Sequence, residues 1–190
     1  GTKYSINCIY LTSDDKLYVG TDNYGLYVYD NGAFNRVAET YNLGVSTINA
    51  MYEDDKDQLW LASSSGIYYL TSDGVKMVDD EGISGYNIGN ISGYDGTIYA
   101  TANNDVLIRV DENGEITVTS KSSYGIDDIN SLYIDENGTR YYGSAGYSIL
   151  TINSKGKVGV ISTGSLHGIN KIYNDGEKIW ILADDGVGYI

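Results

Sequence analysis

The sequence repeats itself about every forty residues, and this repeat limits the possible folds more than any other feature. An isoleucine opens a short apolar segment in each copy, and the openings lie 42, 40, 41 and 40 positions apart. The segments are INCIYL from Ile6, INAMYE from Ile48, IGNISG from Ile88, INSLYI from Ile129 and INKIYN from Ile169. Periods of this length are typical of repeat architectures, in which one unit buries its hydrophobic face only by stacking on the next.

Two more segments follow in every copy. The second, in LYVGT, LWLAS, IYATA, RYYGS and IWILA, carries an aromatic residue at Tyr18, Trp60, Tyr99, Tyr141 and Trp180, and the third begins at Gly25, Gly66, Asp105, Gly146 and Gly186. Short segments that are rich in β-branched and aromatic residues and bounded by turn formers are typical of β-strands. We expect Trp60 and Trp180 to lie in the core between neighbouring sheets.

Tight turns and a weaker fourth segment complete the unit. The turns DNG, SDG, ENG and SKG place glycine where a hairpin needs positive φ. The fourth segments cover residues 34–38, 75–78, 116–119 and 158–162. Four antiparallel strands per repeat describe a propeller blade. The sequence therefore predicts an all-β fold, a β-propeller of about five four-stranded antiparallel blades with the last one incomplete, in a single domain over residues 1–190.

The composition agrees with this class and excludes several partners. The chain has 24 glycines, 20 tyrosines and no proline. Its formal net charge is −14, and its twelve basic residues are scattered, so we expect neither nucleic acid nor an anionic membrane surface as a partner. No run of eighteen apolar residues is present, so this segment is not expected to insert directly into a membrane.

The copies resemble the two-component-regulator propeller repeat. Its pattern is an isoleucine, two residues on another apolar residue, then Asp-x-x-Gly-x-Leu-Trp-Ile-Gly-Thr and a glycine before the third strand. Residues 48–66, INAMYEDDKDQLWLASSSG, match this pattern most closely, and residues 6–25 and 129–146 match it nearly as well. The third copy has Asp105 in place of the glycine, and the fifth ends without a fourth strand. The resemblance covers essentially the whole chain.

This resemblance implies an extracytoplasmic sensor region, periplasmic or extracellular, of a membrane-anchored or secreted bacterial protein. Such regions usually precede a membrane span and a signalling module such as a histidine kinase or a diguanylate cyclase. Members of the family often respond to carbohydrates or their breakdown products. They are also longer than this chain, so the resemblance implies a fragment or a short member.

The ends of the repeat bear on closure of the propeller. Too few residues precede Ile6 to supply the fourth strand that the last copy lacks. An unpaired strand edge can pair with another chain. We therefore expect either an arc of about five blades from a larger ring or a molecule that completes itself by self-association through open blade edges.

Ligands of propellers generally bind over one end of the central channel, on the loops from fourth to first strand and from second to third. Aromatic side chains there can stack on sugar rings, and aspartates can accept hydrogen bonds from hydroxyl groups. The candidate ligand-binding residues are Tyr24, Tyr41, Tyr86, Tyr124, His167, Asp22, Asp127 and Asp184, with Asp185 beside them. The alternative is structural: tyrosines that pack on blade rims and aspartates that cap turns.

Other chemistry has little support in the sequence. There is one histidine, and there is no Gly-x-Ser-x-Gly elbow, histidine pair or phosphate-binding loop, so we expect no cofactor. The acidic turns do not complete a calcium-binding loop, and we expect ordinary turn chemistry and no metal site. The lone Cys8 is expected to be structural. Asn49 and its equivalents after the leading isoleucines are expected to satisfy backbone groups of loops, with contact to a ligand in the channel as the alternative.

Three functions remain open from the sequence. The leading hypothesis is a non-enzymatic sensor that binds a small polar ligand, for which an oligosaccharide is one candidate, and that signals to a module outside this chain. The first alternative is a propeller glycan lyase or hydrolase that uses His167 with a loop aspartate. The second alternative is a scaffold that binds protein along an open edge.

Overall fold

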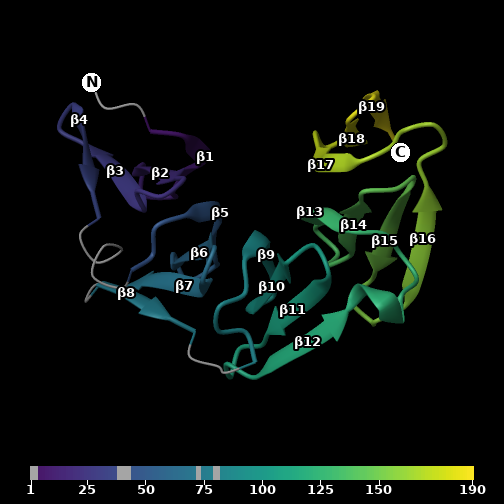
Figure 1. Cartoon of the computed structure of the whole chain (residues 1–190), viewed down its shortest axis with the longest axis horizontal. Helices are drawn as coiled ribbons and strands as arrows, with labels where there is room; N and C mark the ends of the chain where they lie inside the picture. The colour runs from purple at the N-terminus through teal and green to yellow at the C-terminus, as the bar shows by residue number, and fades with distance from the viewer. Residues whose placement is uncertain (1–3, 38–43, 72–73, 79–81) are drawn as a thin grey trace. The chain divides into compact units, whose positions relative to one another are not determined.

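The computed structural model describes residues 4–37, 44–71, 74–78 and 82–190. These residues form antiparallel β-sheets, together with one 3-10 helix, η1 (Lys121–Ser123) (Figure 1). The chain divides into two compact units, Gly1–Ile91 and Ser92–Ile190, and each is described by itself. The prediction of a single domain over the whole chain stays a prediction.

The unit Gly1–Ile91 contains two four-stranded sheets whose strands follow one another in chain order. The first sheet consists of β1 (Ile6–Leu11), β2 (Leu17–Thr21), β3 (Leu26–Asp30) and β4 (Ala33–Arg36). The second sheet consists of β5 (Ile48–Glu53), β6 (Leu59–Ser63), β7 (Gly66–Thr71) and β8 (Gly74–Met77). Each sheet therefore has the strand order of one propeller blade.

The unit Ser92–Ile190 contains the remaining three sheets, and the boundary between the units falls within β9. The third sheet consists of β9 (Ile88–Tyr94), β10 (Thr97–Ala102), β11 (Val106–Val110) and β12 (Ile116–Ser120). The fourth consists of β13 (Ile129–Ile134), β14 (Arg140–Ser144), β15 (Ser148–Ile152) and β16 (Val158–Ser162), and the fifth of β17 (Ile169–Asn174), β18 (Ile179–Ala183) and β19 (Gly186–Tyr189). The fifth sheet has three strands, as the repeat predicted.

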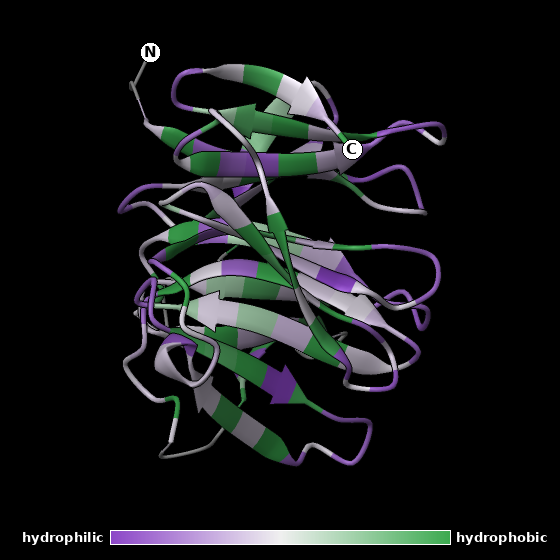
Figure 2. Cartoon of the chain, turned by 90° about the vertical axis from the view of Figure 1, so that its right-hand side faces the viewer, coloured by the Kyte–Doolittle hydropathy of each residue, from purple (hydrophilic) through white to green (hydrophobic). Residues whose placement is uncertain are grey.

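The leading isoleucines of the repeat explain how neighbouring sheets pack. Ile48 and Ile169 are fully buried. A Cβ added to Gly20 would lie 2.8 Å from Ile48 Cγ2, and one added to Gly143 would lie 2.6 Å from Ile169 Cγ2. A small residue in the second strand of one sheet thus leaves space for the isoleucine that opens the next sheet. Figure 2 shows that most hydrophobic segments of the chain lie in the strands and that most hydrophilic segments lie in the turns.

The asparagine after the leading isoleucine forms an irregularity of the first strand. In the second sheet, for example, Ile48 pairs with Ser63 and Ala50 with Ala62, so Asn49 is an extra residue, as in a β-bulge. Its Nδ2 donates to Ile88 O at 2.7 Å. Asn49 therefore satisfies a backbone group, as predicted, but this group opens β9 and does not lie in a loop.

The prediction that Trp60 and Trp180 are core residues is wrong. Both are only partly buried. Their Nε1 atoms donate to carboxylates in the turn between the first two strands of their sheets, to Asp54 Oδ2 at 2.8 Å and to Asp175 Oδ2 at 2.7 Å. The physical reason is that alternate residues of a strand face opposite sides, and that an indole N–H needs an acceptor.

Candidate functional site

A surface cavity lies where the loops of the fourth and fifth sheets meet η1. Its volume is about 540 Å³, and it is lined by side chains that include Lys121, Asp127, Asp128, Tyr147 and His167. We call it the loop-face cavity. Of the predicted ligand-binding residues, it brings together Asp127 and His167.

The two aromatic rings of this cavity contact each other. The ring centroids of Tyr147 and His167 are 5.1 Å apart, with an angle of 57° between the planes. Tyr147 is 55% exposed, so a large part of its ring is open to solvent. The backbone N–H of His167 donates to Asp185 Oδ1 at 2.9 Å, which fixes the loop that carries the imidazole.

Glycines hold two carboxylates close to the rings. A Cβ on Gly146 would collide with the carboxylate of Asp127, and a Cβ on Gly168 would collide with that of Asp184. Asp184 Oδ1 accepts a hydrogen bond from Asn170 Nδ2 at 2.6 Å. Its Oδ2 lies 4.0 Å from His167 Nδ1, which is an ion-pair distance but too long for a hydrogen bond.

A lysine balances part of the negative charge. Lys121 forms an ion pair with Asp128, and its Nζ lies 3.9 Å from Asp105 Oδ1. The hydrogen bond to Asp128 raises the pKa of Lys121, so this side chain stays protonated at neutral pH. The cavity therefore offers a cation, several carboxylate acceptors and an exposed ring face within one small volume.

Tyr124 belongs to the same unit but has a different environment. Its ring packs against a buried cluster that includes Leu107, Leu132 and Tyr142. Its backbone N–H donates to Lys121 O at 2.9 Å, at the end of η1. It does not line the loop-face cavity.

The remaining predicted residues belong to the unit Gly1–Ile91 or lie outside the described residues. Tyr24 is 45% exposed and its ring centroid is 4.4 Å from that of Tyr4. Asp22 Oδ1 accepts a hydrogen bond from Thr47 Oγ1 at 3.3 Å, and Tyr86 is partly buried. Tyr41 lies outside the described residues.

The sequence reasoning missed Tyr147, Lys121 and Asp128. A signal for Tyr147 was present, because the other copies have the aliphatic residues Leu26, Ile67, Val106 and Val187 after the opening residue of the third strand. Leu26 and Ile67 are fully buried, whereas Tyr147 is exposed. Val187 is also exposed, at 64%, so the signal is the change from an aliphatic to an aromatic side chain and not a loss of burial.

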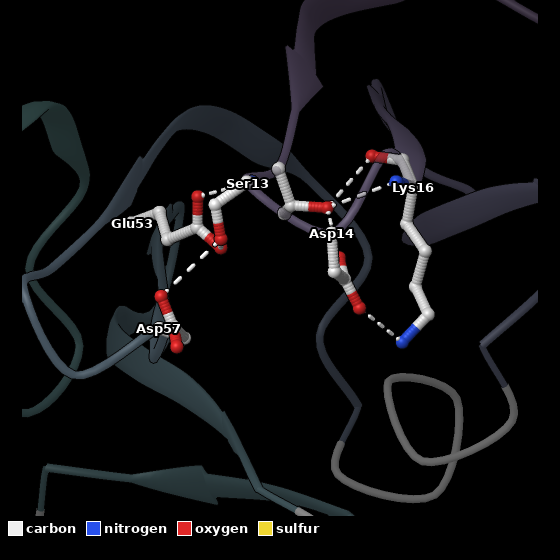
Figure 3. Close-up of polar contacts among 6 residues, drawn as sticks. Ser13, Asp14, Lys16, Glu53 and Asp57 are labelled. Atoms are coloured by element: carbon white, nitrogen blue, oxygen red, sulfur yellow. Dashed lines mark hydrogen bonds and ion pairs between the residues drawn. The ribbon is translucent and has the colours of Figure 1, made fainter.

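A second cavity lies between the first and second sheets. Its volume is about 360 Å³, and its lining includes Ser13, Lys16, Glu53, Asp57 and Leu59. We call it the acidic cavity. Ser13 N donates to Glu53 Oε2 at 2.8 Å, and Ser13 Oγ lies 3.1 Å from Glu53 Oε1 and 3.2 Å from Asp57 Oδ1 (Figure 3). Its carboxylates therefore accept hydrogen bonds from the turn of the neighbouring sheet.

Cys8 has the structural environment that we predicted. Its Sγ lies 3.7 Å from Ile48 O, within the distance of a weak sulfur hydrogen bond. Burial raises the pKa of the Cys8 thiol to about 11. The reactive thiolate is therefore scarce at neutral pH.

Comparisons with known proteins place these sites on a known architecture. Neither a protein-family model nor a curated protein matches the sequence. Among solved structures, the extracellular domain of a candidate hybrid two-component system, BT3049, of B. thetaiotaomicron matches 100% of the chain with a TM-score of 0.81 and 16% identity. The extracellular domain of a candidate one-component system, BT4673, of the same organism matches 97% with a TM-score of 0.76 and 21% identity. The chain has the β-propeller fold.

The chain spans only part of these extracellular domains, and an enzyme has a similar fold. The chain spans 27% of the first extracellular domain and 28% of the second. The virginiamycin B lyase of Staphylococcus aureus matches 100% of the chain, over 70% of the lyase, with a TM-score of 0.71 and 15% identity. Since all three identities are low, the comparisons establish the fold alone.

Two further observations concern the described part of the propeller. No group of three or more His, Cys, Asp or Glu side chains among these residues is arranged to hold a metal ion. None of the helices described is long and apolar enough to cross a membrane.

Proposed function

We propose that this β-propeller chain is a non-enzymatic recognition module of an extracytoplasmic bacterial sensor, and that it binds a small polar ligand such as an oligosaccharide in the loop-face cavity. The proposal includes the assignment of its repeats to the two-component-regulator propeller type. The similarity to extracellular domains of candidate sensors supports the sensor role. The observation that carries the ligand class is the exposed ring pair of Tyr147 and His167 beside Asp127.

The chemistry of the cavity matches a sugar ring. A sugar presents C–H groups on its faces, which pack on aromatic rings, and hydroxyl groups on its edges, which donate to carboxylates. Tyr147 supplies the exposed ring, and Asp127 supplies acceptors at the rim. A ligand that joins the loops of the fourth and fifth sheets favours one packing of these sheets, and this shift is the signal that an output module can detect.

The test is the thermal midpoint of the chain with a panel of neutral oligosaccharides. A ligand that binds only the native state raises the midpoint. Tyr147→Ala should abolish the rise, whereas Tyr173→Ala, which removes a tyrosine that is 59% exposed in β17, should leave it unchanged. The proposal fails if no saccharide raises the midpoint or if the two variants respond alike.

One observation favours an enzyme as the second candidate. His167 Nδ1 and Asp184 Oδ2 are 4.0 Å apart at the rim of the cavity, so a small movement would give the imidazole a carboxylate partner. A glycan lyase or hydrolase predicts cleavage products after incubation with the saccharide that binds. His167→Ala should then abolish cleavage, whereas intact saccharide after long incubation excludes this candidate.

A further inference from the structure

A third cavity lies between the third and fourth sheets, at the opposite end of β14 from the loop-face cavity. Its volume is about 390 Å³, and its lining includes Tyr94, Asp95, Thr97, Arg109, Arg140 and Ser154. We call it the arginine cavity. The chain has 12 lysines and arginines against 26 acidic residues, and only three of the twelve are arginines. Two of these three meet in this cavity.

Arg140 is held in one orientation. Its Nε donates to Ile152 O and its Nη2 to Asn153 O, both at 3.3 Å. The guanidinium carbon lies 4.5 Å from the centre of the Tyr99 ring, a distance typical of a cation–π contact. These contacts fix the plane of the guanidinium and use two of its five N–H donors.

Arg140 also lacks a carboxylate partner among the described residues, because none of the ion pairs found there includes it. Both of its hydrogen-bond acceptors are neutral carbonyl groups. A fixed guanidinium with spare donors and no counter-charge is suited to a planar oxyanion, which it can bind with two parallel hydrogen bonds.

Arg109 supplies the second positive charge. It lies in β11 directly opposite Tyr99 of β10. Its Nη1 forms an ion pair with Asp111 Oδ2 at 3.8 Å, a distance too long for a hydrogen bond. Asp111 Oδ1 already accepts the backbone N–H groups of Asn113 and Glu115, both at 2.9 Å, so this carboxylate is committed to its own turn.

The rest of the lining suits a hydroxylated molecule. Asp95, Thr97 and Ser154 supply acceptors and hydroxyl groups. Tyr94 has room to lie against the neighbouring turn because residue 138 is glycine. A Cβ on this residue would lie 2.5 Å from Tyr94 Cε1 and 2.6 Å from Tyr94 Cδ1. A volume of about 390 Å³ falls in the range of sites for small molecules.

We propose that the arginine cavity binds a small hydroxylated organic acid, whose carboxylate contacts Arg140 and Arg109 and whose hydroxyl groups contact Asp95, Thr97 and Ser154. The site is separate from the loop-face cavity and does not depend on the function proposed for that cavity. The net charge of the chain, −14, by itself repels anions. An anion that binds here must therefore do so through local contacts.

The experiment is a calorimetric or NMR titration of the whole chain with D-glucuronate, with D-glucose and inorganic sulfate as reference probes, at constant ionic strength. Glucuronate has both the carboxylate and the hydroxyl groups, whereas each reference probe lacks one of them. We expect glucuronate to bind at least about tenfold more tightly than either reference. Arg140→Gln should weaken its binding about tenfold or more, and Arg109→Gln should weaken it by a smaller factor.

Arg36→Gln is the matched control, because it makes the same charge change at an exposed position of β4 and should leave the affinity within about twofold. The circular dichroism spectrum and the thermal midpoint of each variant verify that it folds. If Arg140→Gln does not fold, Arg109→Gln alone still tests the proposal. Equal binding of glucuronate and glucose would overturn the proposal. So would sulfate that binds as tightly as glucuronate, or a loss in Arg36→Gln as large as in Arg140→Gln.

Discussion

The acidic cavity and the arginine cavity lie at equivalent places of the repeat, beside the turn that joins the first two strands of a sheet. Their volumes are similar, about 360 and 390 Å³. Leu59 lines the first and Arg140 lines the second, and these residues open β6 and β14 at the same repeat position. In the acidic cavity, Ser13 donates two hydrogen bonds to the carboxylate of Glu53. In the arginine cavity, Arg140 has no carboxylate partner among the described residues. Equivalent positions of the repeat thus form hydrogen bonds between turns in the acidic cavity and a candidate binding site in the arginine cavity.

The largest contrast should appear at the shared repeat position. Leu59 is 3% exposed and belongs to a buried cluster, so Leu59→Ala should lower the free energy of unfolding by about 3 kcal/mol. Arg140→Ala removes one cation–π contact and two hydrogen bonds at a partly exposed site, and should cost about 1 kcal/mol. Urea denaturation of both variants measures the difference. Equal losses would show that Arg140 is a structural residue.

A second contrast concerns the turns themselves. Gly138 has φ of +74° and Asp57, its equivalent, has φ of +60°. Gly138→Asp would bring a Cβ against the Tyr94 ring and should cost about 2 kcal/mol, whereas Asp57→Gly relieves the left-handed conformation and loses one hydrogen bond, so it should change stability by less than about 1 kcal/mol. The thermal midpoints of this reciprocal pair test the expectation. A tolerated Gly138→Asp would mean that Tyr94 is free to move.

Much of the fold could be predicted from the sequence because each blade repeats the same packing. The leading isoleucines identified the first strands, and Ile48 and Ile169 are fully buried as the stacking of units requires. The tryptophans were misplaced because a repeated aromatic residue shows that a position matters but not which side of the strand it faces. Trp60 meets a turn carboxylate, and that contact depends on the side chain's direction and not on its hydrophobicity.

The sites could be predicted only in part. Loop residues such as His167 and Asp127 stand out by residue type, and the structure places both in one cavity. Tyr147 and Arg140 lie within predicted strands, where they look like ordinary strand residues until the five copies are compared. Each replaces an aliphatic residue of the other copies, but the partner across the sheet boundary, such as Tyr99 for Arg140, follows only from the fold.

A smaller effect should come from the hydrogen bonds that only the acidic cavity has. Glu53 accepts two hydrogen bonds from Ser13, and the equivalent residue of the fourth sheet is Ile134. Glu53→Ile should therefore cost about 1 kcal/mol, because these bonds are partly exposed to solvent. A double-mutant cycle with Ser13→Ala measures the coupling by urea denaturation. A coupling near zero would show that water replaces Glu53 at no cost.

Asp54, in the turn beside the acidic cavity, has an equivalent in the fifth sheet, which is Asp175. Trp180 Nε1 and the backbone N–H groups of Glu177 and Lys178 donate to its carboxylate and lower its pKa from 3.8 to about 2. A depressed pKa means that the ionised carboxylate stabilises the folded state above pH 3.8, and that this stabilisation is lost as the pH falls through about 2.

The difference in urea midpoint between the wild type and Asp175→Asn should therefore be constant above about pH 4 and shrink toward zero between pH 4 and pH 2. Trp180→Phe removes the largest cause of the shift, so the pKa of Asp175 should rise and the loss should begin at a higher pH. A difference that is independent of pH would mean that the indole contacts the turn without stabilising its charge. Trp180 would then act by packing, as the sequence first suggested.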